Sequence, residues 1–219
     1  MKILERTGKS QPRTLRQEVY IHLKQDIITC RLAPGELLNE GDLAEQMGVS
    51  KTPVREALSQ LQKDNLVKLI SRKGYLVTTL TLRDIQEIFE TRLILERSAT
   101  ELAAERITEE EIKMVESYLK INFDPNDSST FFSYIQANTD FHLEIARASH
   151  NSRLVEHLAR EFIDAQRLQF MDLDTGEGPW AWLQDHERIL KALRDHDPKA
   201  AAAAVEDSIA GARIRLLSL

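Results

Sequence analysis

The sequence predicts a mainly α-helical protein, with an N-terminal winged helix-turn-helix followed by an all-α bundle of six to seven helices. Two observations indicate the first part: a pair of short helical patterns meets at Gly48, and two β-rich runs follow. A third indicates the bundle, because beyond residue 82 no useful β-rich run returns. We therefore expect one domain over residues 1–80 and a second over residues 81–219.

A helical stripe of apolar residues predicts the first helix, from Thr14 to about Arg31. The LAPG turn of residues 32–35 ends this helix, and residues 36–38 can add a short strand beside the later hairpin. Cys30 is the only cysteine of the chain. It can form no intrachain disulfide, and we expect a buried structural thiol.

The next two helices are short and meet at Gly48. Asn39 is a suitable N-cap for the first helix and Ser50 for the second, in which Pro53 suits the first turn. Glycine can turn the chain after a helix because it adopts positive φ at little cost. Such a pair is a helix-turn-helix, whose second helix enters the major groove of DNA by its N-terminal end.

Two β-rich runs, residues 66–70 and 75–79, flank the tetrapeptide Ser-Arg-Lys-Gly. Gly74 suits the chain reversal, and Arg72 and Lys73 place two cations at its tip. An ordinary hairpin is the alternative for these residues taken alone. Together with the preceding helix pair, they predict the wing of a winged helix.

The segment LAPGELLNEGDLAEQMGVSKTPVREALSQLQKDNLV resembles the DNA-binding domain of GntR-type bacterial transcription regulators, and the resemblance continues through the wing to Val77. Lys51 departs from the family, which usually has arginine there. A lysine ammonium group therefore replaces a guanidinium, which can donate two parallel hydrogen bonds to one base. The resemblance implies DNA contacts by one group of residues on the second helix and the wing: Ser50, Lys51, Thr52, Arg55, Arg72, Lys73 and Gly74.

The charge distribution favours DNA as the partner of the first domain. The chain has a net charge of −6, but residues 1–80 hold 13 Lys and Arg against 9 Asp and Glu. Residues 81–219 hold 16 Lys and Arg against 26 Asp and Glu, and we interpret this acidic excess as a solvated surface. Because duplex binding is dominated by phosphate neutralisation, the local surplus of cations matters more than the total.

No apolar run approaches the length of a membrane span, and residues 1–13 lack the apolar core of a signal peptide. We therefore expect a cytoplasmic protein without a membrane partner.

Helical patterns follow one another through the second domain. Thr108 and Glu111 form a capping box, and Asp197 can cap a helix that starts at Pro198. Six helices joined by short loops predict an α-bundle. The expected helices cover residues 82–106, 108–119, 130–148, 151–171, 180–196 and 198–217, with a loop over residues 122–128.

Polar residues on inward helix faces mark a candidate site in this bundle. Asn138 and His142 are four residues apart and share one helix face, and His186 lies on the apolar side of a later helix. Imidazoles from two antiparallel helices can converge on one metal ion. Hydrogen-bonded core histidines are the alternative on the sequence alone.

Three segments, residues 81–104, 138–151 and 185–209, resemble the all-helical effector-binding domain of the FadR branch of GntR regulators, called FCD. The resemblance implies a divalent metal such as zinc, nickel or manganese, bound by Asn138, His142 and His186 and leaving open positions for a carboxylate effector. The position of a third histidine falls on Ser208. We therefore expect a weakly held metal, with a metal-free pocket as the alternative.

Arg92 matches an inward-facing arginine of such domains and lies on an otherwise apolar helix face. A buried guanidinium needs an anionic partner, which is either a bound organic acid or Glu96, four residues on. Trp180 and Trp182 either line the pocket or cap the bundle.

The predicted function is sequence-specific transcription regulation: a homodimer binds a double-stranded operator, and a small effector in the bundle modulates its operator affinity as repressor or activator. The effector-binding residues would be Arg92, Asn138, His142 and His186. One alternative is a metal-dependent hydrolase fused to a DNA-binding module, although no HExxH or comparable base motif is present. Another is an architectural DNA-binding protein without a ligand.

Overall fold

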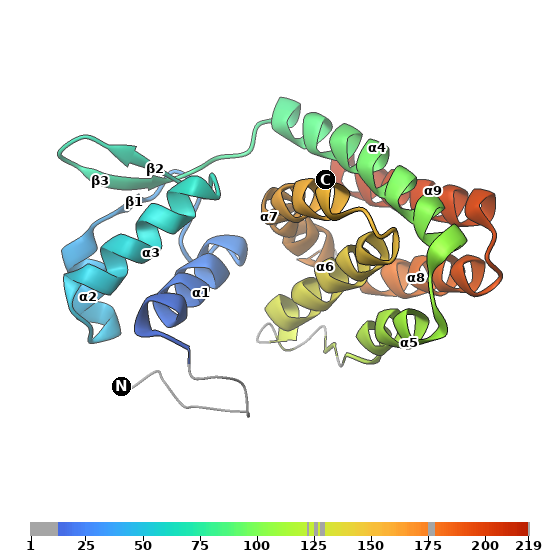
Figure 1. Ribbon diagram of the computed structural model, residues 1–219. Coiled ribbons are helices and arrows are strands. Elements are labelled where there is room, and N and C mark those ends of the chain that lie inside the picture. The colour runs from blue at the N-terminus through green and yellow to red at the C-terminus, as the bar shows by residue number, and fades with distance from the viewer. Residues whose placement is uncertain (1–12, 122, 125–126, 128–129, 175–177, 219) are drawn as a thin grey trace. The chain divides into compact units, whose positions relative to one another are not determined.

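The computed structural model describes residues 13–121, 123–124, 127, 130–174 and 178–218. It divides into two compact units, the first ending at Leu80 and the second starting at Thr81. The described part is mainly helical, with one small sheet, which confirms the predicted fold class (Figure 1). Among the described residues, no helix is long and apolar enough to span a membrane.

The first unit is a winged helix-turn-helix. Its three strands form an antiparallel sheet in the order β1-β3-β2, with Leu38 opposite Tyr75 and Lys68 opposite Leu76. Helix α1 packs on α3 through a core that includes Leu23 and Leu58. The elements are α1 (Leu15–Ile28), β1 (Leu37–Leu38), α2 (Glu40–Met47), α3 (Lys51–Lys63), β2 (Val67–Ile70) and β3 (Gly74–Val77).

The turn between α2 and α3 follows the predicted chemistry. The Asn39 side chain accepts a hydrogen bond from the Gly41 N–H at the start of α2, and Gly48 ends that helix at φ 66°. Ser50 is the N-cap residue of α3, but its side chain makes no capping hydrogen bond. Its hydroxyl is therefore not committed to the helix end.

The residue that reverses the chain at the hairpin tip is not the predicted one. Arg72 adopts the left-handed conformation at φ 62°, and Lys73 N–H donates to the Ile70 carbonyl oxygen. Gly74 begins β3 at φ 121°, where a Cβ atom would overlap the carbonyl oxygen of Leu38. Glycine is required here for two reasons: the two backbones approach closely, and φ is positive.

Cys30 corrects another expectation. It is exposed, not buried, and lies just past the end of α1 at φ 54°. The chain leaves the helix there, so the thiol turns away from the core positions Ile27 and Ile28.

In its described part, the second unit is a bundle of six α-helices with a short 3₁₀ turn, within the predicted six to seven. Helix α4 runs along α9, while α6 packs on α7 (Figure 1). Of the predicted loop, only residues 123, 124 and 127 are described, and the side chain of Trp180 lies outside the described set. The elements are α4 (Leu82–Arg106), α5 (Glu109–Ser117), η1 (Tyr118–Lys120), α6 (Phe131–Ala148), α7 (Ser152–Asp174), α8 (Gly178–Arg194) and α9 (Pro198–Leu217).

Candidate functional site

The predicted DNA-contacting side chains are all accessible on the first unit. Ser50, Lys51 and Thr52 form the start of α3 and are exposed, while Arg72 and Lys73 are exposed at the hairpin tip. The unpaired N–H groups and positive dipole end of a helix N-terminus favour a phosphate. The arrangement therefore presents cations and hydroxyls on the two elements that a winged helix uses to contact DNA.

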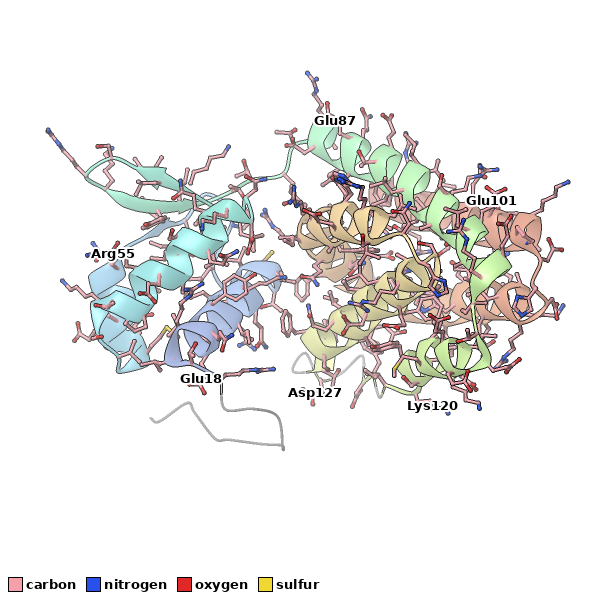
Figure 2. All side chains as sticks on the ribbon, viewed as in Figure 1. Glu18, Arg55, Glu87, Glu101, Lys120 and Asp127 are labelled. Atoms are coloured by element: carbon pink, nitrogen blue, oxygen red, sulfur yellow. The ribbon has the colours of Figure 1, made fainter. Side chains whose placement is uncertain are left out.

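Arg55 is held by a carboxylate from the preceding helix. Its Nε and Nη2 donate to both oxygens of Glu40, with Nη2 2.8 Å from Oε2, and the arginine side chain is 65% exposed. Figure 2 shows Arg55 leaving α3 beside α2. A fork of this kind fixes the direction of the guanidinium but leaves it accessible to a base edge.

We expect Lys73→Ala to lower the salt dependence of DNA binding. Losing one phosphate contact reduces the slope of log K against log salt by about 0.9. Fluorescence anisotropy of labelled duplex DNA over a series of salt concentrations measures that slope. Lys63→Ala, an exposed lysine at the other end of α3, is the control and should leave it unchanged. An unchanged slope in Lys73→Ala would place the hairpin tip off the DNA.

A cavity of about 20 Å³ lies in the second unit and is lined by residues of α4, α6, α7, α8 and α9. It brings together every effector or metal residue predicted from the sequence. Trp182 also lines the cavity, so this tryptophan is a pocket residue. The predicted residues are Arg92, Asn138, His142, His186 and Ser208, and all of them are buried.

Glu96 lies at the centre of the charged network around the cavity. One of its oxygens is 2.7 Å from Arg92 Nε and the other is 2.9 Å from His142 Nδ1. Burial alone would raise the pKa of Glu96, but the charges of Arg92 and His142 and their hydrogen bonds lower it to about 2. Arg92 is thus paired within the protein, and its guanidinium also lies 5.0 Å from the centroid of the Phe162 ring.

His186 is buried among aromatic rings. Its ring stacks on Phe141 with centroids 4.1 Å apart, and it meets the ring of His142 edge-on at 5.1 Å. Burial, with a smaller contribution from His142, lowers the pKa of His186 well below its usual value. His186 is therefore a neutral imidazole at pH 7.

The stability of the second unit should fall as the pH is lowered below about 6.5. In the unfolded chain His186 binds a proton below about pH 6.5, but in the folded protein it resists protonation, so acid favours unfolding. Between pH 6.5 and 5, the resistance of His186 to protonation lowers the free energy of unfolding by up to about 2 kcal/mol. Urea unfolding with a chelator present should show a smaller pH dependence in His186→Gln than in the wild type. The exposed His157→Gln is the control, and equal pH dependence in all three proteins would contradict a buried neutral His186.

The histidine pair partly fits a metal ion. Because Nδ1 of His142 lies 2.9 Å from Glu96, the other ring nitrogen, Nε2, would be the ligand atom. Two imidazoles bound to one zinc-like ion, at about 2.0–2.1 Å from metal to nitrogen, have centroids about 5 Å apart, near the observed 5.1 Å. Within the described residues, however, no group of three His, Cys, Asp or Glu side chains could hold an ion.

Sequence reasoning missed three further residues of the cavity region. Asp172 on α7 is buried and accepts two hydrogen bonds from Arg215 of α9, each 2.8 Å long, and one from Trp182 Nε1 of α8. Gln169 lies one turn before it and also lines the cavity. A usable signal was present, because Gln169 and Asp172 continue the 4-3 spacing of apolar residues along α7 and are the polar members of that series.

The first unit has the winged helix-turn-helix typical of DNA-binding transcription regulators, and the second is a helical unit with a small cavity lined in part by polar side chains. The chain belongs to the bacterial regulatory proteins of the gntR family, whose model matches residues 15–77, and it carries an FCD domain over residues 87–211. These matches identify a DNA-binding transcription regulator and not an enzyme, which removes the hydrolase alternative.

Relatives along most of the chain support this assignment. An uncharacterised HTH-type transcriptional regulator of Bacillus subtilis, YdhC, is 32% identical and covers 84% of this chain and 83% of its own length. The Uxu operon transcriptional regulator of Escherichia coli is 31% identical over 92% of this chain and 86% of its own. A GntR regulator from Rhodococcus shares the fold with a TM-score of 0.75 at 22% identity, over 93% of this chain and 97% of its own.

Proposed function

We propose that this regulator works as a cytoplasmic homodimer on a pseudo-palindromic operator and that a small organic acid in the cavity changes its operator affinity. Two copies of α3 and of the hairpin would contact two half-sites, through the exposed residues of the first unit described above. An effector that binds one arrangement of the dimer better than another shifts the equilibrium between them.

The single observation that supports an effector site is the convergence of Arg92, Asn138, His142 and His186 on one buried cavity. Bundle interiors are normally filled with apolar side chains, so a buried polar cavity suits a ligand better than it suits a structural core. Among the described residues, Arg92 donates to Glu96 through its Nε alone. The remaining guanidinium N–H groups suit a carboxylate.

A divalent metal, such as zinc, nickel or manganese, would be held by His142, His186 and Asn138, and it would offer a carboxylate additional positive charge. Two imidazoles and an amide oxygen make a weaker set than the three histidines of related domains. Ser208 lines the same cavity at the position of the absent ligand. Metal-free binding of the acid by Arg92 is the alternative.

We expect Ser208→His to raise metal affinity about tenfold or more, because a third imidazole would enter the cavity where Ser208 now lies. Isothermal titration with zinc measures the affinity. Thermal unfolding in excess zinc should show a matching rise in Tm, since a ligand of the folded state stabilises it. Ser208→Phe adds similar bulk without a ligand atom and should show no gain. Equal zinc affinity of the histidine variant and the wild type would exclude the histidine pair as a metal site.

The test of the function is operator release by an acid. Wild-type protein on an operator selected from random duplex DNA would be titrated with succinate, malate and succinamate, with and without zinc, while anisotropy reports binding. Arg92→Gln and His186→Gln should blunt the response but bind operator normally without the acids, because the DNA-contacting residues are in the other unit. Normal responses in both variants would show that the cavity is not the effector site.

A further inference from the structure

Gln169 carries a side-chain amide that is buried in the second unit. Its side chain is 5% exposed and lines the cavity. Neither its Nε2 nor its Oε1 has a hydrogen-bond partner among the described residues. An amide carries two donors and an acceptor, and burying them unsatisfied destabilises a fold. An amide that stays in such a position calls for a functional explanation.

The charged groups around the cavity are, by contrast, matched within the protein. Arg92 contacts Glu96, and Asp172 accepts hydrogen bonds from Nε and Nη2 of Arg215. A ligand that took the place of Glu96 or Arg215 would have to break an existing pair. Gln169 requires no such exchange, because its amide has no partner among the described residues that a ligand would have to displace.

We propose that Gln169 is the specificity-determining residue of the effector site, an inference that rests on the proposed function. Its Nε2 donates to an acceptor of the ligand, and its Oε1 accepts from a donor on a neighbouring atom. The ligand group is therefore one that carries a donor and an acceptor side by side, namely a primary amide or a hydroxyl adjacent to a carboxylate. A plain carboxylate offers acceptors only and would leave Oε1 facing oxygen lone pairs.

Gln166 provides a matched control on the same helix. It is also buried, but only its Oε1 has no partner among the described residues, since its Nε2 donates to the Thr139 hydroxyl at 3.2 Å. It is not among the residues that line the cavity. The same substitution at the two positions therefore removes an amide without any hydrogen bond in one case and an amide with one hydrogen bond in the other.

The first measurement is the Tm of the ligand-free protein in chelator. Gln169→Leu should raise the Tm by about 2–4 °C, because an apolar side chain replaces an unsatisfied amide of similar size. Gln166→Leu should lower it, since Thr139 loses its partner. A fall in Tm for Gln169→Leu as large as that for Gln166→Leu would overturn the inference, because the amide would then be satisfied within the protein.

The second measurement is the affinity for matched probes by isothermal titration. Wild type should bind malate and succinamate about tenfold or more tightly than succinate, and Gln169→Leu should bind all three equally weakly. The inference would be overturned if wild type bound the three probes equally or bound none of them. It would also be overturned if Gln169→Leu kept the wild-type preference.

Operator release separates this inference from the proposed function. If malate or succinamate releases the operator from wild type and Gln169→Leu alike, the regulatory function stands and the role of Gln169 fails. If the probes bind with the expected preference but leave operator affinity unchanged, the role of Gln169 as a ligand contact stands and the regulatory function of the cavity fails.

Discussion

Replacing Glu96 with alanine should destabilise the second unit by about 3–5 kcal/mol, the cost typical of removing one partner of a buried ion pair. Glu96 is 2% exposed and contacts both Arg92 and His142, so the substitution leaves a buried guanidinium without its counter-ion. The burial of Arg92, at 6% exposure, prevents water from taking over that role.

Urea unfolding followed by tryptophan fluorescence measures this loss in the second unit alone, because both tryptophans of the chain, Trp180 and Trp182, belong to it. Glu101→Ala is the control: Glu101 lies on the same helix but is a partly exposed partner of Arg97 (Figure 2). Exposed pairs contribute little, so that variant should unfold within about 0.5 kcal/mol of the wild type. Similar free energies of unfolding in both variants would mean that Arg92 is not held by Glu96.

Arg55→Ala should weaken operator binding about 10- to 100-fold, the range expected for an arginine that contacts a base edge. Its guanidinium is already oriented by Glu40 at the edge of α3, so little side-chain freedom remains to be lost on binding. The relative loss should be smaller on DNA of unrelated sequence, because phosphate attraction dominates there.

Anisotropy titrations on the selected operator and on unrelated duplex DNA test this prediction. Arg83→Ala is the matched control, because Arg83 is also an exposed arginine paired with a carboxylate, Glu87, but it lies in the second unit. Equal losses on both DNAs in Arg55→Ala would identify a phosphate contact and not a base contact. Unchanged affinity would exclude α3 as the recognition helix.

Local chemistry explains why much of the fold could be predicted from the sequence. The capping boxes and apolar stripes depend on residues three or four apart, which the sequence displays directly. Thr108 and Glu111 form the predicted box at the start of α5, and Asp197 caps α9 through the N–H groups of Lys199 and Ala200. Fold class and family were confirmed on this basis.

What could not be predicted depends on contacts between distant segments. The need for glycine at position 74 arises from the carbonyl oxygen of Leu38, which a turn rule does not include. The Asp172 contacts join α7 to Arg215, 43 residues later, so spacing alone could mark Asp172 as polar and inward but could not name its partner. The exposure of Cys30 was predicted wrongly, because the general preference of cysteine for the interior says nothing about where a helix ends.

The close backbone approach at Gly74 has a consequence for how this protein selects DNA by shape. Leu38, whose carbonyl oxygen Gly74 contacts, is followed directly by Asn39, which caps α2. The tip end of the hairpin, where β3 begins, and the start of the helix pair are therefore joined through two adjacent residues and cannot tilt independently. With the DNA contacts proposed above, the protein acts as a rigid template, and groove widths that do not match must be corrected by deforming the duplex. Stiff base steps between the two contacts would then reduce affinity even where no side chain touches them.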